Sequence, residues 1–460
     1  MKLAALLAIV LLVPRAEGQA DDPPGTKGTQ APDGLKALKH PDAAVRYKAA
    51  ALLVRLGPVG KIAVPDLREA LKDSNGYVRV KAAEALWTIE KTSPTVLLPV
   101  LVRALTSKEP DLRAAAAAVL GKMGAKAKNA VPPLIEALKD KDEGVCLEVV
   151  AALGEIGAVA RDAAPALLNL VGEDKSILEP FVVSSLANMG AAIVGVLDKA
   201  LADPVVQRRR VAAEALGMIG PPARPATKSL GLRLADSDAL VRVEAAKTLG
   251  KIGPDAAPAV MLLTGALVDP IVFVRIEAAL ALWRIEGRVR SMAVLLEDLN
   301  DPSAAARADA CRALGTIGPA AKEAGPGLGK LLSDKASPVR QRAAEALGNI
   351  GPASANLDHS LRKLLADEEA MVRITAALSL WQVTGKAEAS LETLGKGLKD
   401  EDRLVRRYSV VFLGNIGKMA QSMIPDLMEC LQEEDSGMRV AVKDALMSID
   451  PDAARKAGVR

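Results

Sequence analysis

The charged pair that recurs most often in this sequence is an arginine with an acidic side chain six positions before it. The forked N–H groups of a guanidinium bind carboxylates or backbone carbonyls. A carboxylate at a turn accepts hydrogen bonds from backbone N–H groups at a helix start. A catalytic site would be singular, whereas this pair recurs along the chain, so we interpret it as a structural ladder. Its clearest members are Asp73 with Arg79, Asp236 with Arg242, Asp269 with Arg275, Asp334 with Arg340, Asp367 with Arg373, and Asp400 with Arg406.

Residues that could support other chemistry are scarce. The two histidines, His40 and His359, are far apart, and neither is near a Gly-x-Ser-x-Gly sequence. The Leu-Gly-x-Ile-Gly segments end helical patterns instead of following strands, so they do not predict a phosphate-binding loop. Cys146, Cys311 and Cys430 lie in separate repeats and predict no intramolecular disulfide, and Cys311 reads as a packing residue. We predict no catalytic residue, no cofactor and no metal site.

The recurring arginine marks a unit of 30 to 34 residues that fills nearly the whole chain. We call the arginine position the slot. Cys146 and Glu179 occupy the slot in two units, and a leucine follows seven residues after it in all thirteen. A period of this length is typical of stacked helical repeats, which present a binding surface instead of an active-site cleft.

Each unit reads as two helices. Between residues 241 and 252 apolar side chains recur every three or four positions, as on one face of an α-helix. Gly253-Pro254 then stops this helix, and Leu263 and Leu267 lie on a second one. Neither helix can bury its apolar stripe alone. The sequence therefore predicts an all-α protein, a right-handed α-solenoid of about thirteen stacked two-helix repeats.

These units resemble HEAT repeats, and most of all the short HEAT-like class named after phycocyanobilin lyases. The shared pattern is Asp…Val-Arg-x-x-Ala-Ala-x-Ala-Leu-Gly-x-Ile-Gly-Pro, which is clearest over residues 236–254. The resemblance covers roughly residues 34–460. It implies an α-solenoid with a ladder of contacts along its inner turns. It also implies two kinds of function, because the class includes scaffolds and enzymes.

The enzymes of this family depend on residues that the chain lacks. Deoxyhypusine hydroxylases build a di-iron site from His-Glu pairs just after the recurring arginine. Here the glutamates remain as Glu148, Glu244 and Glu277, but the residues before them cannot bind metal: Leu147, Val243 and Ile276. No residue set supports bilin lyase chemistry. We therefore predict a non-catalytic scaffold for protein–protein interaction. The alternatives are an enzyme of the bilin lyase or hydroxylase type and a structural spacer without a specific ligand.

The chain ends and one irregular interval suggest the domain boundaries. Residues 1–20 have the apolar run and small-residue end of a secretory signal peptide, and 21–33 read as a flexible linker. Glu179 in the slot is followed by Pro180, and the next interval shrinks to 30 residues. This predicts a shortened second helix or entry segment and a candidate hinge or change of superhelical pitch between a block at 34–190 and a block at 191–460. The alternative is a local repair of the stack without further consequence. We expect an exported protein, periplasmic or secreted, from a bacterial host, with no membrane span.

Positions two, five and nine after the slot should face solvent. Four apolar residues at two of these positions, two and five, predict a partner-binding surface: Leu280, Leu378, Tyr408 and Val411. Polar positions of the same stripe would form its rim: Arg284, Lys48 and Lys81. The alternative is that the apolar members pack under neighbouring repeats. The partner is expected to be a protein, because 60 Lys+Arg against 56 Asp+Glu are too balanced for binding nucleic acid. The sequence specifies neither the partner nor the oligomeric state.

The three tryptophans share one register. Trp87, Trp283 and Trp381 lie eight residues after the slot, where seven other units have glycine. We predict that they fill space over an altered turn; the alternative is three aromatic anchors on a binding surface.

Overall fold

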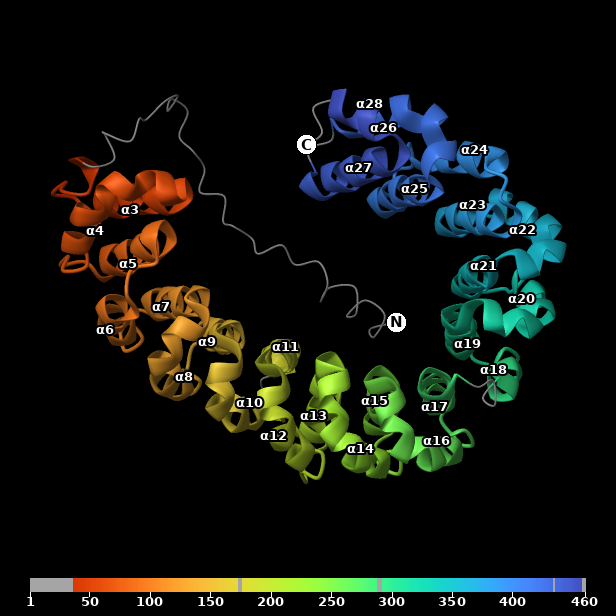
Figure 1. Ribbon diagram of the computed structural model, residues 1–460, viewed down its shortest axis with the longest axis horizontal. Coiled ribbons are helices and arrows are strands. Elements are labelled where there is room, and N and C mark those ends of the chain that lie inside the picture. The colour runs from red at the N-terminus through yellow and green to blue at the C-terminus, as the bar shows by residue number, and fades with distance from the viewer. Residues whose placement is uncertain (1–35, 173–175, 288–291, 433–434, 457–460) are drawn as a thin grey trace. The chain divides into compact units, whose positions relative to one another are not determined.

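The computed structural model describes residues 36–172, 176–287, 292–432 and 435–456 (Figure 1). The predicted signal peptide and linker lie outside these residues. The described residues form α-helices and 3-10 helices and contain no β-strand, which confirms the all-α prediction. The chain divides into two compact units, one ending at Arg233 and one beginning at Leu234. The division predicted from the sequence, at 190/191, stays a prediction.

The first unit alternates slot helices with shorter second helices. Its slot helices are α3 (Ala43–Leu56), α5 (Gly76–Glu90), α7 (Pro110–Lys122), α9 (Glu143–Ile156), α11 (Glu179–Met189) and α13 (Val206–Ile219). Its second helices are α4 (Val64–Ala70), α6 (Pro94–Ala104), α8 (Val131–Ala137), α10 (Ala164–Asn169), α12 (Val194–Ala200) and α14 (Thr227–Arg233).

The second unit continues the alternation. Its slot helices are α15 (Ala239–Ile252), α17 (Val272–Glu286), α19 (Ala304–Ile317), α21 (Ser337–Ile350), α23 (Ala370–Thr384), α25 (Arg403–Ile416) and α27 (Ser436–Ile449). Its second helices are α16 (Val260–Ala266), α18 (Met292–Asp298), α20 (Gly325–Leu331), α22 (Asp358–Lys363), α24 (Glu388–Gly397) and α26 (Ile424–Cys430), and α28 (Pro451–Lys456) follows α27.

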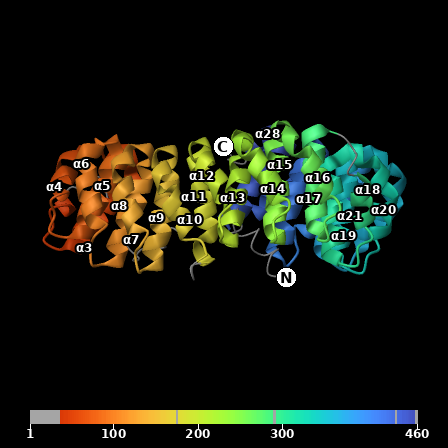
Figure 2. The same cartoon turned by 90° about the horizontal axis from the view of Figure 1, so that it is seen from below.

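Within each unit the slot helices form one layer and the second helices form another, with the core between them. Figure 2 shows successive helices of a unit side by side in a row. The leucine seven residues after the slot lies on a slot helix in every repeat, and none of the thirteen is more than 4% exposed. The α-solenoid prediction is confirmed.

The turn between the two helices of a repeat is more ordered than the sequence suggested. Gly253 ends α15 with φ of 77°, and its N–H donates to the carbonyl of Leu249. Most residues avoid this φ, which glycine adopts readily. Pro254 then opens a 3-10 helix, Gly253–Ala259, instead of only stopping the previous helix. Proline suits this position because the first N–H of a helix has no partner within it.

Equivalent 3-10 helices follow eight other slot helices: Gly57–Ala63, Gly124–Ala130, Gly157–Ala163, Gly190–Ile193, Pro221–Ala226, Gly318–Ala324, Gly351–Leu357 and Gly417–Met423. Two others, Ser176–Leu178 and Leu364–Ala366, lie elsewhere in their repeats.

The irregular interval at Glu179 has its cause in this turn. The 3-10 helix after α11 is Gly190–Ile193, with four residues where the equivalent after α9 has seven. The entry segment of the second helix is therefore the shortened part, as the sequence predicted. Pro180 lies in the first turn of α11, where its missing N–H costs no hydrogen bond.

Slot helices approach one another closely where small residues face each other. Many slot helices have a glycine eight residues after the slot. This glycine packs against the next slot helix, at the residue that lies six positions after that helix's own slot. A Cβ on Gly154 would lie 2.8 Å from Cα of Ser185, and one on Gly315 would lie 3.0 Å from Cα of Ala346. These glycines set the distance between neighbouring repeats.

Substitution of these glycines should therefore destabilise the protein. We expect Gly154→Ala to lower the free energy of unfolding by about 1–3 kcal/mol, because the new methyl group forces the backbones of α9 and α11 apart. Gly265 on α16 is the matched control, since nothing lies within 4 Å of a Cβ placed there. Gly265→Ala should be neutral or stabilise by up to about 1 kcal/mol through helix propensity. Denaturant unfolding of both variants tests this, and equal effects would contradict it.

The tryptophan repeats have a different turn. α5 is one residue longer than a typical slot helix and is capped at its C-terminus by Lys91, whose φ is 52°. The ammonium of Lys91 lies 4.8 Å from the centre of the Trp87 ring. Trp87 is buried, and its indole N–H donates to the carbonyl of Lys122 at 3.0 Å. Trp283 and Trp381 are half-buried against the core of the second unit. These contacts support the packing interpretation.

Candidate functional site

The predicted ladder joins adjacent repeats. In five places an arginine donates through Nε and Nη2 to both carboxylate oxygens of an aspartate 27 residues later, in the next repeat. In the rung Arg340–Asp367 the two distances are 2.7 and 2.8 Å. The other rungs are Arg46–Asp73, Arg113–Asp140, Arg242–Asp269 and Arg307–Asp334. Such bidentate pairs are among the stronger protein hydrogen bonds.

The acid six residues before an arginine contacts that arginine through its backbone. Arg340 Nη1 donates to the carbonyl of Asp334 at 3.0 Å, and Arg79 Nη1 donates to that of Asp73 at 2.6 Å. The carbonyls of Asp236, Asp269, Asp367 and Asp400 accept from Arg242, Arg275, Arg373 and Arg406 in the same way. The spacing of 27 residues between an arginine and the next acid was the signal that could have revealed the rungs.

The pattern varies at other slot residues, among them Arg275, Arg373 and Cys146. Arg275 Nη2 donates to Asp298 at 2.5 Å, and Asp301 lies 4.0 Å away. Burial raises the pKa of Asp298. Arg373 lies 3.8 Å from Asp400 and forms a weaker rung. Cys146 fills the slot by placing its sulfur 3.2 Å from the carbonyl of Asp140.

The rungs should make stability sensitive to acid. The hydrogen bond from Arg46 holds the pKa of Asp73 below its ordinary value, and Arg113 does the same for Asp140. A carboxyl with a lowered folded-state pKa binds protons more readily in the unfolded chain. Its stabilisation is therefore complete above the unfolded pKa of about 3.9 and is lost as pH falls through the folded value.

We accordingly expect the melting temperature to fall steeply below about pH 4. The double variant Asp73→Asn with Asp140→Asn should melt lower at pH 7 and lose less between pH 6 and pH 3, because two titrating rungs are gone. Thermal melts across this range test the expectation. A double variant that keeps the full acid-dependent drop would rule out these rungs as its source.

The stripe two, five and nine residues after the slot carries two buried glutamates. Glu84 accepts from Lys81 at 2.7 Å and from Lys122 at 2.5 Å. Glu277 accepts from Arg312 at 2.7 Å, and its burial raises its pKa. These charges connect neighbouring slot helices, so they contribute to packing and are not freely available to a partner.

The predicted partner-binding residues divide by burial. Leu280 was expected to face solvent, and this is wrong: it is 0% exposed and belongs to the core with Ile276 and Leu314. The slot helix α17 is apolar on more than one face, so position five points into the core here. Leu378 is half-buried, whereas Tyr408 is 45% and Val411 39% exposed.

The predicted rim residues lie in both units. Arg284 in the second unit and Lys48 in the first unit are exposed. Lys81 is half-buried, held by Glu84, and lies 5.5 Å from the centre of the Tyr47 ring.

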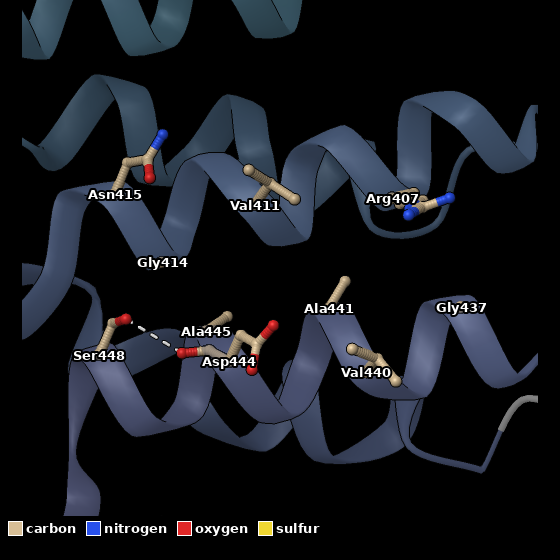
Figure 3. A pocket seen from close by; sticks show the side chains of 10 residues that line it. All are labelled: Arg407, Val411, Gly414, Asn415, Gly437, Val440, Ala441, Asp444, Ala445 and Ser448. Carbon is tan, nitrogen blue, oxygen red and sulfur yellow. Dashed lines mark hydrogen bonds between the residues drawn. The ribbon is translucent and has the colours of Figure 1, made fainter. Parts of the chain in front are cut away.

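Tyr408 and Val411 belong to α25, which borders a groove shared with α27. We call this space, of about 420 Å³, the C-terminal groove. Figure 3 shows its two walls. The residues of α25 are Arg407, Val411, Gly414 and Asn415, and those of α27 are Gly437, Val440, Ala441, Asp444, Ala445 and Ser448. Val440 is 58% exposed, and Met447 on the same helix is 43% exposed. Tyr408 packs on Phe412 with ring centres 5.9 Å apart.

Sequence reasoning found Val411 and its neighbour Tyr408 but missed the α27 wall. Val440 lies one residue and Asp444 five residues after the slot Arg439. The stripe rule includes position five, yet Asp444 is charged and was not among the apolar candidates. Val440 is one residue after the slot, a position that the predicted stripe does not include. A side chain at this position lines a groove only where two neighbouring slot helices leave a gap between them.

The described residues show no group of three or more His, Cys, Asp or Glu side chains that could hold a metal ion. The three cysteines are buried and form no disulfide, and burial raises the pKa of Cys311 to about 12. One helical stretch, Glu179–Ala200, is long and apolar enough to cross a membrane by length and composition alone, and 44% of its most apolar window is buried. This stretch comprises α11, the following 3-10 helix and α12. Core helices of other proteins can also be this long and this apolar.

A family model for HEAT repeats matches residues 31–98, 97–179, 292–381 and 357–447. The chain belongs to the HEAT repeat family. The phycocyanobilin lyase-type subclass stays a prediction. No curated protein matches the sequence.

Solved structures of similar fold include karyopherins. The Kap95:Nup1 complex matches with 16% identity and a TM-score of 0.58, over 92% of this chain and 68% of that one. Kap95p with RanGDP matches with 16% identity and a TM-score of 0.51, over 92% and 67%. Kap121p bound to the extreme C-terminus of Cdc14p matches with 16% identity and a TM-score of 0.46, and the chain spans 53% of its length. At 16% identity these matches indicate a similar fold and nothing more.

Proposed function

We propose that this protein is a non-catalytic scaffold that binds a protein partner through the C-terminal groove, together with Leu378 on α23 and Tyr408 on α25. Membership of the HEAT repeat family supports the scaffold. The observation that carries the site is a groove lined by the exposed side chains of Val411 and Val440, with the exposed Tyr408 three residues before Val411 on the same helix. Apolar side chains left exposed together on a folded surface are typical of interaction sites.

The absence of catalysis is part of this proposal. The positions that hold histidines in the related hydroxylases are Leu147, Val243 and Ile276, and Ile276 is fully buried. Aliphatic side chains donate no electron pair to a metal. The proposal also includes export to the periplasm or the medium, which rests on the signal-like composition of residues 1–20.

The test is a pair of surface variants compared for capture of a partner from the exported fraction. Tyr408→Ser with Val411→Ser should abolish capture, because burying two such side chains in an interface contributes roughly 1.5–3 kcal/mol each. The free energy of unfolding should change by less than about 1 kcal/mol, because both side chains are partly exposed in the free protein.

The matched control removes apolar surface elsewhere in the second unit. Met261 and Val268 are 86% and 84% exposed. Met261→Ser with Val268→Ser should capture the partner as the unchanged protein does. A large loss of stability in the Tyr408 and Val411 variant would assign these residues to the core. Unchanged capture with unchanged stability would place the partner site elsewhere.

A further inference from the structure

The C-terminal groove carries opposite charges toward its two ends. The half-buried Arg407 lies at one end, where its Nη1 is 3.7 Å from the place of a Cβ on Gly437. The exposed Asp444 lies toward the other end, and Figure 3 shows Val411 and Val440 between the two charges. A ligand that fills the groove should therefore present a carboxylate and a cation with apolar side chains between them.

Neither charge is used within the protein. In the described part of the chain, the side chains of Arg407 and Asp444 form no hydrogen bond or ion pair. The carboxylate of Asp435 lies near the Arg407 end, but it already accepts from Arg403 and from two backbone N–H groups at the start of α27. Both groove charges are therefore available to a partner.

The repeat register explains why Arg407 has no partner. Gln341 lies one residue after the slot on α21 and donates to Thr375, which lies two residues after the slot on α23. Arg407 lies one residue after the slot on α25, and the residue two after the slot on α27 is Ala441, whose methyl group accepts no hydrogen bond. The stack thus supplies no acceptor at a position where α25 has a guanidinium, a group that binds carboxylates strongly.

The two charges are about 9 Å apart along the helices. A Cβ on Gly414 would lie 3.1 Å from Cα of Ala445, so the position eight residues after the slot on α25 is level with the position six residues after it on α27. With this offset of two residues, Asp444 lies six residues further along the groove than Arg407. Six residues of α-helix rise about 9 Å.

The walls of the groove select a helical ligand. Both walls are faces of α-helices, whose backbone N–H and C=O groups are bonded inside α25 and α27. The middle of the groove is aliphatic, with Val411, Val440 and Ala441. An extended segment would leave its own backbone groups without partners there, which costs free energy. An α-helix bonds its backbone groups internally and presents only side chains.

The spacing of the charges fits one face of such a helix. Residues i and i+7 lie on the same face about 10.5 Å apart, and residues i+3 and i+4 lie between them. We propose that the C-terminal groove binds an amphipathic α-helix of the partner with a lysine or arginine at i, aliphatic residues at i+3 and i+4, and an aspartate or glutamate at i+7. The base pairs with Asp444, the aliphatic residues pack on Val411 and Val440, and the acid pairs with Arg407.

This order makes the ligand helix antiparallel to α25 and α27. The negative C-terminal end of its dipole then points toward Arg407, and the positive N-terminal end points toward Asp444. Anchors at i, i+3, i+4 and i+7 are the usual pattern of a helix that docks in a groove. The inference names the partner chemistry of the proposed function and rests on it.

The test is a selection with displayed peptides. The whole chain is the bait, and the probe is a phage library of helical peptides about sixteen residues long, randomised on one face, because shorter helices are marginal in water. A second library of equal length carries a central proline, which breaks the helix. We expect the helical library to yield base, two aliphatic residues and acid at i, i+3, i+4 and i+7, and the proline library to yield no common pattern.

Exchanging the groove charges should exchange the charges of the selected peptides. Arg407→Glu with Asp444→Lys should select an acid at i and a base at i+7. For the peptide selected most often by the unchanged protein, Arg407→Ala should raise the dissociation constant by about tenfold or more in fluorescence anisotropy, because one of two charge pairs is lost. The melting temperature of Arg407→Ala should not change, because the Arg407 side chain forms no hydrogen bond within the described residues.

Arg284 provides the matched control, because it is an exposed arginine on α17 that does not line the groove. Arg284→Ala should bind the selected peptide as the unchanged protein does. Equal selection from the two libraries, the same charge order from both baits, or full affinity of Arg407→Ala would overturn the proposal. A dimer of the protein that the charge exchange abolishes would assign the groove to a second copy and would also overturn it. Loss of partner capture in the Tyr408 and Val411 variant, with no helix selected, would refute this inference and leave the proposed scaffold function intact.

Discussion

Replacing Arg340 by alanine is expected to lower the free energy of unfolding by about 3–5 kcal/mol, the usual cost of breaking a buried ion pair. Arg340 is 8% exposed, and its side chain holds both oxygens of Asp367 as well as the carbonyl of Asp334. The variant leaves a buried carboxylate and a turn carbonyl without their donor. Urea unfolding of purified protein measures the loss.

Arg342 is the control on the same helix. It pairs with Glu345, three residues away, and both side chains are about 45% exposed. Arg342→Ala should cost less than about 1 kcal/mol, since exposed pairs contribute little. A double variant, Arg340→Ala with Asp367→Ala, should be less destabilised than the sum of its single variants, because no unpaired charge remains. Similar losses for Arg340→Ala and Arg342→Ala would contradict the role of the ladder.

Truncation of a slot-helix leucine is expected to have a comparable effect. Leu347 is 0% exposed and packs with Leu314, Ala344 and Leu380 in the core of the second unit. Leu347→Ala should cost about 2–5 kcal/mol, from lost burial and the cavity left behind. Stacked repeats contact only their neighbours, so backbone amides of α19, α21 and α23 should exchange faster than those of α15.

Hydrogen exchange followed by mass spectrometry separates these helices. Leu262→Ala is the control, since Leu262 is 47% exposed on α16, and it should change stability by less than about 0.5 kcal/mol. Equal acceleration over all described helices of the second unit would mean that the unit unfolds as one cooperative block, and would refute local damage.

Periodicity alone was enough to determine the architecture. A leucine seven residues after each slot, a helix stop such as Gly253-Pro254 and a second pair of leucines specify two amphipathic helices, and neither can bury its stripe without a neighbour. Local chemistry also explains Pro65, Pro132, Pro165 and Pro425, which all lie in the first turn of a second helix, where a missing N–H costs no hydrogen bond. These features depend on residues close together in the chain, so a sequence reading can find them.

Only the tertiary structure decided which partners meet across repeats. Arg340 and Asp367 are 27 residues apart, and their contact depends on how one repeat stacks on the next. The same stacking buries Leu280 and leaves Tyr408 exposed, although position five and position two belong to one predicted stripe. Burial depends on the gap between neighbouring helices, which small residues such as Gly315 and Ala346 set by close approach. Helical period specifies the direction of a side chain, whereas the distance to the next helix determines whether that direction leads to solvent, a groove or the core.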